Sequence, residues 1–364
     1  MHRPSSIAIL LALTGACSSG NHAQVEAPAV QESTGSATPS EAAAYEVHEW
    51  GLLRAEAGDV LRVSAVAPPV QPEMLSVDKP LLYFHTDAPL TLRSVRVATP
   101  GGALLETWPY VAGTHAATWT QVRIAHEEVC APSPLPQANQ APCLGLPPNV
   151  FCEAPGLAIT RTADAACVHV GDATERFLFY RAEARTYTPP LRFARRADGE
   201  VEVTNEGDAA IPGVLVHIRR ENGASHAWSE PAPAPHATRT LQHAQASASD
   251  EMADRPVAPS DVEAGRRGIR QTMHELGLTM EEIEAFLRAW DQALFGPGAI
   301  DIPPIDVLTQ DGRDGDFGAQ ETVLYFLPES TLSGIATLTF DPPPRALHRA
   351  LALWTSLPRS GSSR

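Results

Sequence analysis

Histidine and carboxylate side chains that could perform acid–base or metal chemistry occur in two short segments early in the chain. The first segment reads Val-His-Glu-Trp-Gly and holds His48 and Glu49, and the second carries His85. On a β-strand, His48 and Glu49 would point to opposite faces, so one metal ion could not take both as ligands. One hypothesis from these residues is a metal-assisted hydrolase centred on His48, Glu49 and His85.

Two further histidines, His115 and His126, could complete such a site. The chain has no His-Glu-x-x-His motif, no close histidine pair, no nucleophile elbow and no phosphate-binding glycine loop. The competing interpretation is that Trp50 packs in the core and His48 makes a local hydrogen bond, and the residue types favour this interpretation.

A second candidate site lies in an acidic, glycine-containing segment near residue 314. Carboxylates spaced by glycines can wrap oxygen ligands around Ca²⁺. The pattern departs from an EF-hand, because Arg313 and Gly315 stand at ligand positions, and a plain acidic turn is the competing interpretation. No cofactor is therefore predicted, and Ca²⁺ is retained only as a weaker hypothesis. The candidate ligands are Asp311, Asp314, Asp316 and Glu321.

The N-terminus has the features of an export signal. A short basic start precedes an apolar run, and small residues lead into Cys17, which resembles a bacterial lipobox. We therefore expect residues 1–16 to be a lipoprotein signal peptide and Cys17 to carry the lipid. Residues 17–44 hold almost no bulky apolar side chains and are predicted to be a flexible tether. The expected location is the cell envelope, with the protein anchored in a membrane and facing the periplasm or the exterior.

Four cysteines follow the lipobox, and an even number in an exported chain predicts disulfides. Three pairings are possible, of which Cys130–Cys143 with Cys152–Cys167 is the simplest because both loops are local. A zinc site is the competing interpretation, but the spacings lack the close Cys-x2-Cys pairs that such sites use.

Four blocks of sequence carry a resemblance to known proteins. Residues 47–51 (Val-His-Glu-Trp-Gly) and 79–86 (Lys-Pro-Leu-Leu-Tyr-Phe-His-Thr) are the first two, and residues 177–181 and 323–328 are the others. Together they resemble an uncharacterised family of exported bacterial proteins or lipoproteins that opens on a His-Glu-Trp-Gly motif. The resemblance implies a shared fold over scattered blocks and implies no chemistry.

These candidate residues must be positioned by short strands. Between residues 45 and 245, apolar runs and alternating segments recur at short intervals and are separated by Gly, Pro, Asp and Asn. This spacing is typical of an antiparallel, sandwich-like β-body. Residues 130–167 are predicted to be a proline-rich insertion that bears the disulfides. Residues 222–260 suggest one strand near residues 238–241 and otherwise a linker, clearest at 246–260.

Helical patterns appear late in the chain, within a predicted α+β region at residues 261–357. Thr279 and Glu282 form a capping box, and an apolar stripe follows it at helical spacing. Strands are expected at residues 322–327 and 335–340, and residues 358–364 are expected to be a disordered tail. A last amphipathic helix is predicted from the apolar stripe of Leu347, Leu351, Trp354 and Leu357. The predicted fold class is α+β, rich in β-structure.

Composition limits the possible partners. The net charge of −16 repels nucleic acid, so the chain is not expected to bind it. The sequence favours a non-enzymatic envelope lipoprotein that binds a protein or glycan partner or serves as a structural module. The metal-assisted hydrolase is the alternative, and a lipid carrier with an apolar cavity is a third.

Overall fold

The computed structural model describes residues 45–55, 75–126, 130–134, 157–184, 187–221, 224–242, 261–296 and 320–357. Cys17, the tether, Cys143, Cys152, the three aspartates of the calcium hypothesis, the 246–260 linker and the C-terminal tail lie outside these residues. The described chain is β-rich, with antiparallel sheets and a few helices, which confirms the predicted α+β class.

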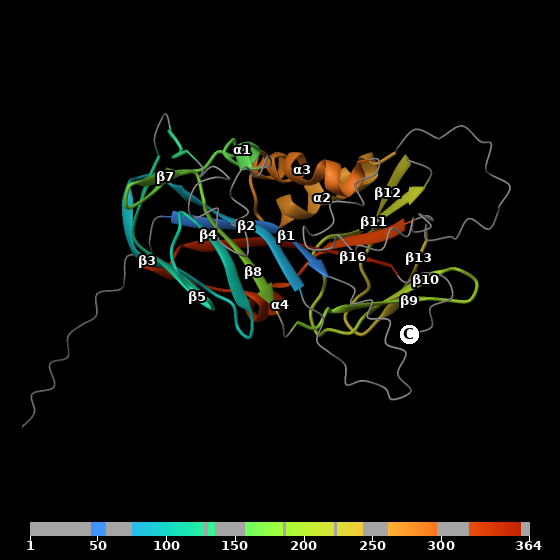
Figure 1. Ribbon diagram of the computed structural model, residues 1–364. Helices are drawn as coiled ribbons and strands as arrows, with labels where there is room; N and C mark the ends of the chain where they lie inside the picture. The colour runs from blue at the N-terminus through green and yellow to red at the C-terminus, as the bar shows by residue number, and fades with distance from the viewer. Residues whose placement is uncertain are drawn as a thin grey trace, which may run out of the picture. The chain divides into compact units, whose positions relative to one another are not determined.

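The main sheet has eight strands and forms the centre of the molecule (Figure 1). Its one parallel pairing among the described strands joins β1 to β16. Its order is β12 (Ala224–Pro231), β11 (Val214–Glu221), β14 (Gln320–Phe326), β16 (Ala346–Ser356), β1 (Tyr45–Ala55), β2 (Leu75–Thr86), β8 (Leu178–Ala184) and β4 (Ala103–Trp108).

Two smaller antiparallel sheets accompany it. One has the order β13 (Thr238–Leu241), β10 (Val201–Asn205) and β9 (Leu191–Arg195). The other has the order β15 (Thr337–Asp341), β3 (Leu90–Ala98), β5 (Ala116–Ala125), β6 (Cys167–Val170) and β7 (Ala173–Glu175). The helices are α1 (Leu157–Thr160), α2 (Glu263–Glu275), α3 (Met280–Phe295) and α4 (Glu329–Ile335). No helix within the described segments combines the length and the apolar character needed to cross a bilayer.

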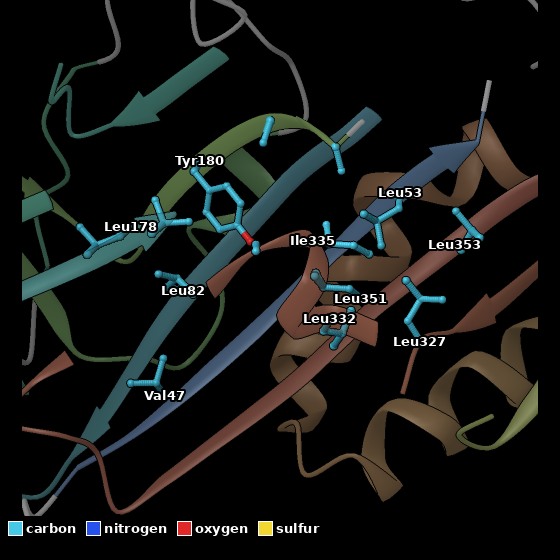
Figure 2. Packing of buried hydrophobic residues seen from close by; sticks show 14 of the residues in the cluster. Val47, Leu53, Leu82, Leu178, Tyr180, Leu327, Leu332, Ile335, Leu351 and Leu353 are labelled. Atoms are coloured by element: carbon cyan, nitrogen blue, oxygen red, sulfur yellow. The ribbon is translucent and has the colours of Figure 1, made fainter. Parts of the chain in front are cut away.

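The two faces of the main sheet bury separate apolar cores. On one face, Val47 and Leu53 of β1 pack with apolar residues of the two smaller sheets and of α4. Figure 2 shows Val47 and Leu53 together with Leu351 and Leu353 of β16 and Leu332 of α4. The opposite face is covered by α2 and α3 (Figure 1). A strand buried on both faces explains why the central segments are apolar almost throughout.

The helix predicted over Leu347, Leu351, Trp354 and Leu357 is wrong, because this segment is the central strand β16. Leu351 and Leu353 point into one core, while Ala350 and Ala352 point into the other. In a short run that is buried on both sides, the apolar residues match both the two-residue period of a strand and the 3.6-residue period of a helix. Local spacing therefore cannot separate a strand from a helix here. Pairing with β1 and β14 decides the outcome.

The segment from residue 222 also differs from the prediction. Ala224–Pro231 forms the edge strand β12, which pairs with β11, whereas the sequence suggested a linker before residue 238. The strand at Thr238–Leu241 is present as β13. The predicted C-terminal region contributes β14 and β16 to the middle of the main sheet.

Candidate metal centre

Neighbouring strands bring three histidines and a glutamate to one end of the main sheet. His48 on β1 lies beside His348 on β16 in the parallel register, and Glu46 on β1 lies across from His85 on β2. Glu46 and His48 are two residues apart on one strand, so their side chains share a face. This is the face covered by α2 and α3, because Trp50, two residues further along, belongs to the core beneath those helices.

Helix α3 supplies a second carboxylate, Glu282, at its N-terminus. The predicted capping box is present: the Thr279 hydroxyl accepts the Glu282 N–H at 3.3 Å, and Glu282 Oε2 accepts the Thr279 N–H at 2.9 Å. The same carboxylate accepts hydrogen bonds from His48 Nδ1 at 2.8 Å and from His85 Nε2 at 3.0 Å. Helix capping thus fixes the carboxylate that orients both imidazoles.

Glu282 is fully buried yet remains ionised. Burial raises its pKa, but the hydrogen bonds from His48 and His85 outweigh burial and lower the pKa to about 2. An ionised carboxylate can only accept hydrogen bonds, so His48 must donate from Nδ1. In the neutral ring, the Nε2 atom of His48 then carries the lone pair.

The free nitrogen of His48 faces a second carboxylate. Only 5 % of the His48 side chain is exposed, and its Nε2 has no hydrogen-bond partner among the described residues. Glu46 Oε2 lies 3.8 Å from this nitrogen. Arg345 holds the other oxygen, Oε1, through Nε at 3.1 Å and Nη2 at 2.6 Å. That hydrogen bond is the main reason that the pKa of Glu46 is lowered, so Oε2 is an anionic donor atom facing His48.

His348 is oriented in the same way by a backbone group. Its Nδ1 lies 3.1 Å from the carbonyl oxygen of Leu276, in the turn between α2 and α3. A carbonyl can only accept, so Nδ1 carries the hydrogen and Nε2 is left with the lone pair in the neutral ring. Gly277 makes this approach possible: its φ is +92°, and a Cβ there would lie 2.2 Å from His348 Nδ1.

Two groups of three residues have donor atoms within 4.8 Å of one another, and His48 belongs to both. In the group of His48, His85 and Glu282, the two contacts to the carboxylate are hydrogen bonds of 2.8 and 3.0 Å, in which the ionised Glu282 accepts. In the group of Glu46, His48 and His348, both Nδ1–H groups are engaged elsewhere and the lone pairs remain. The second group is therefore the better ligand set, with Glu282 and Leu276 as its supporting acceptors.

Two histidines and one carboxylate can bind a divalent transition metal. Zn²⁺ accepts these ligands at about 2.0–2.2 Å in a tetrahedron, which places neighbouring ligand atoms about 3.3 Å apart. The 3.8 Å gap between Glu46 Oε2 and His48 Nε2 would need to close by about half an ångström. Three protein ligands leave a coordination position for water or substrate.

Glu49 lies on the other face of β1, as the strand periodicity predicted. Its Oε1 accepts the Tyr180 hydroxyl at 2.6 Å, and its Oε2 pairs with Arg349. Burial, followed by the Glu49 charge, raises the pKa of Tyr180 well above its usual range. This buried network cannot reach the cluster around His48, so Glu49 drops out of the site.

Neither of the other two suggested histidines joins the cluster. The His115 ring bonds the carbonyl of Gly102 at 2.7 Å, and His126 is exposed beyond the end of β5. Sequence reasoning missed Glu46 and His348. The Glu-x-His spacing of Glu46 and His48 was an available signal on a strand, but His348 was concealed by the mistaken helix.

The disulfide found among the described residues joins Cys130 to Cys167, with Cα atoms 5.6 Å apart. The simplest predicted pairing, in which Cys130 bonds Cys143 and Cys167 bonds Cys152, is therefore wrong. Pairing of β5 with β6 places Ala125 opposite Cys167, which brings the two ends of the insertion together. Local loop length was a poor guide because the sheet closes the longer loop.

Glu321 is the one residue of the calcium hypothesis that the structure describes. Its carboxylate forms an ion pair with Arg195 and lies 3.8 Å from His217 Nε2. Only 7 % of the Glu321 side chain is exposed. The other three candidate ligands lie outside the described residues, so the calcium hypothesis stays a prediction.

No protein-family model, curated protein or solved structure matches this chain. The resemblance to exported proteins with a His-Glu-Trp-Gly motif therefore stays a prediction.

Proposed function

We propose that the protein binds one divalent transition-metal ion, with Zn²⁺ as the first candidate, through Glu46, His48 and His348. The observation that carries this proposal is the matched orientation of the two imidazoles. Each uses Nδ1 to donate to an acceptor and keeps Nε2 for an ion. Metal-binding histidines typically show this arrangement, because the outer acceptor fixes the tautomer and raises the basicity of the ligand.

The test is a Zn²⁺ titration of the full chain after dialysis against a chelator. We expect one ion per chain by calorimetry and elemental analysis. Loss of a supporting acceptor typically costs 10–100-fold in affinity, so His48→Ala and His348→Ala should each cost at least about 100-fold. His236→Ala is a matched control, because His236 also bonds a carboxylate, that of Asp208, but its side chain is 65 % exposed.

Wild-type affinity in both ligand variants, or less than stoichiometric metal in the wild type, would refute the proposal. That result would leave the competing proposal, a non-enzymatic module that binds a protein or glycan. His48 would then act only as a donor to Glu282.

We further propose that this body is tethered to a membrane by lipid on Cys17. The basic start, apolar run and small residues before Cys17 support the proposal. The Cys130–Cys167 disulfide is compatible with it, because disulfides persist in oxidising compartments outside the cytoplasm. Intact mass of detergent-extracted protein should show cleavage before Cys17 and added acyl chains. An unacylated product that retains Met1 would overturn the anchor.

A further inference from the structure

The proposed metal centre is open on one side. Glu46 has 28 % of its side chain exposed and His85 has 23 %, whereas His48 and Glu282 are almost completely buried. Solvent can therefore approach from the side of Glu46 and His85. A divalent ion bound in such a site would lower the pKa of a bound water to about 7 and would so supply hydroxide at neutral pH.

His85 is the imidazole of the cluster that the proposed ion does not use. It donates from Nε2 to Glu282, so its Nδ1 carries the lone pair in the neutral ring. Its ring centroid lies 4.2 Å from that of His48, and it sits across from Glu46 in the strand register. Directly opposed residues have Cβ atoms about 5 Å apart, so the His85 side chain begins next to that of Glu46, and 23 % of it is exposed.

Arg345 adds a fixed positive charge at the same place. Its Nε and Nη2 atoms hold Glu46 Oε1, while 61 % of its side chain remains exposed. A guanidinium has five N–H donors, so Arg345 can hold Glu46 and still offer donors to an incoming group. A metal ion together with an exposed guanidinium is a typical clamp for the oxygens of a phosphoryl group.

We infer that this centre hydrolyses phosphate esters, with Arg345 holding the phosphoryl oxygens and His85 accepting the proton of the attacking water. The inference rests on the proposed metal site. Water gives its proton to His85 Nδ1, and the hydroxide oxygen forms a bond to phosphorus. The bond from phosphorus to the ester oxygen breaks, the departing oxygen keeps the electron pair, and it takes the proton back from His85. The products are an alcohol and inorganic phosphate, with no net redox change.

The experiment measures release of p-nitrophenol by the full chain loaded with Zn²⁺, Mn²⁺ or Co²⁺. We expect turnover of p-nitrophenyl phosphate, inhibition by inorganic phosphate, and little turnover of the neutral ester p-nitrophenyl acetate. Arg345→Gln should raise KM for the phosphate ester about 10- to 100-fold, because hydrogen bonds to charged groups are lost. His85→Gln should lower kcat at least about tenfold with KM nearly unchanged.

Arg192→Gln is the matched control, because Arg192 is also an exposed arginine in an ion pair, with Glu206, but lies on β9. Metal content is measured for every variant. A stoichiometric ion without phosphate-ester hydrolysis would overturn this inference and leave the metal site standing. Equal hydrolysis of both esters, or a KM indifferent to Arg345→Gln, would also overturn it. Failure to bind metal would remove both proposals.

Discussion

Glu282 links the stability of the fold to the candidate site, because one buried carboxylate satisfies a helix N-terminus and two histidines. Its two oxygens receive three hydrogen bonds, which hold the carboxylate between the helix N-terminus and the two imidazoles. The carboxylate also sets the tautomer of His48. A residue that appeared in the sequence only as a capping signal thereby acquires a second role.

The pH dependence of folding should report this carboxylate. The pKa of Glu282 is lowered from 4.5 to about 2, against the effect of burial, by hydrogen bonds from His48 and His85. A group whose pKa is lower in the folded state stabilises the protein fully above its unfolded pKa. We therefore expect a contribution on the order of 3 kcal/mol above about pH 4.5, lost as the pH falls towards 2.

Urea denaturation at several pH values measures this contribution. Glu282→Gln should lower the free energy of unfolding at pH 7 and flatten its decline between about pH 4.5 and 2. Glu284→Gln is the control, because Glu284 lies on the same helix with its side chain 40 % exposed. Parallel pH curves for wild type and Glu282→Gln would contradict the assignment.

Gly277 should tolerate no side chain. Its φ of +92° is unfavourable for other residues, and a Cβ would lie 2.2 Å from His348 Nδ1. Gly277→Ala should therefore cost about 1–3 kcal/mol of stability and also weaken Zn²⁺ binding, because His348 must move. The measurements are the urea midpoint and the zinc titration.

Gly334→Ala on α4 is the control: no atom lies within 4 Å of the added Cβ, so we expect no loss. Unchanged zinc affinity in Gly277→Ala would show that His348 is not a ligand.

At the scale of elements, the sequence predicted those segments whose signal is local. The α3 capping box and the alternating strand β3 are where local pattern placed them, because caps and half-buried strands carry their own periodicity. Strand β16 was mistaken for a helix because its residues are buried from both sides, a property that only its neighbours β1 and β14 confer. Because of that error, His348 was not recognised as a candidate site residue. A residue of the site could therefore be predicted only where the helix or strand that carries it could also be predicted.

The cap of α3 is the element on which the orientation of Glu282 depends. Thr279→Ala removes the hydroxyl that accepts the Glu282 N–H, and loss of such an N-cap typically costs about 1 kcal/mol. We also expect weaker Zn²⁺ binding, because fraying of the first turn loosens Glu282 and hence His48. Thr279→Ser keeps the acceptor and should retain both stability and affinity. Loss of stability without any change in zinc affinity would show that the cap and the site are independent.

At the scale of the whole molecule, the candidate site needs both ends of the described chain. Glu46 and His48 lie on the first strand and His348 on the last, and the parallel pairing of β1 with β16 joins them. Helices α2 and α3 then cover the same face and bring Leu276 and Glu282 to the histidines. The late segment therefore completes the core and the site together. This explains why no single stretch of sequence carried a complete ligand motif.

The Cys130–Cys167 disulfide should stabilise this whole body by restricting the unfolded chain. The two cysteines are 37 residues apart, and closing a loop of that length contributes about 4 kcal/mol in the chain-entropy description. The double variant Cys130→Ser with Cys167→Ser should lower the urea midpoint accordingly. The zinc affinity of the folded protein should stay near that of the wild type, because the disulfide joins the β5–β6 region and not the strands that bear the ligands.

Non-reducing peptide mapping of the wild type checks the connectivity directly, and recovery of Cys130 linked to Cys143 would contradict it. Loss of zinc binding without denaturant, with the sheet still folded, would contradict this independence and would point to the contacts of the insertion with β2, such as the hydrogen bond from the Ala166 N–H to the Phe84 carbonyl.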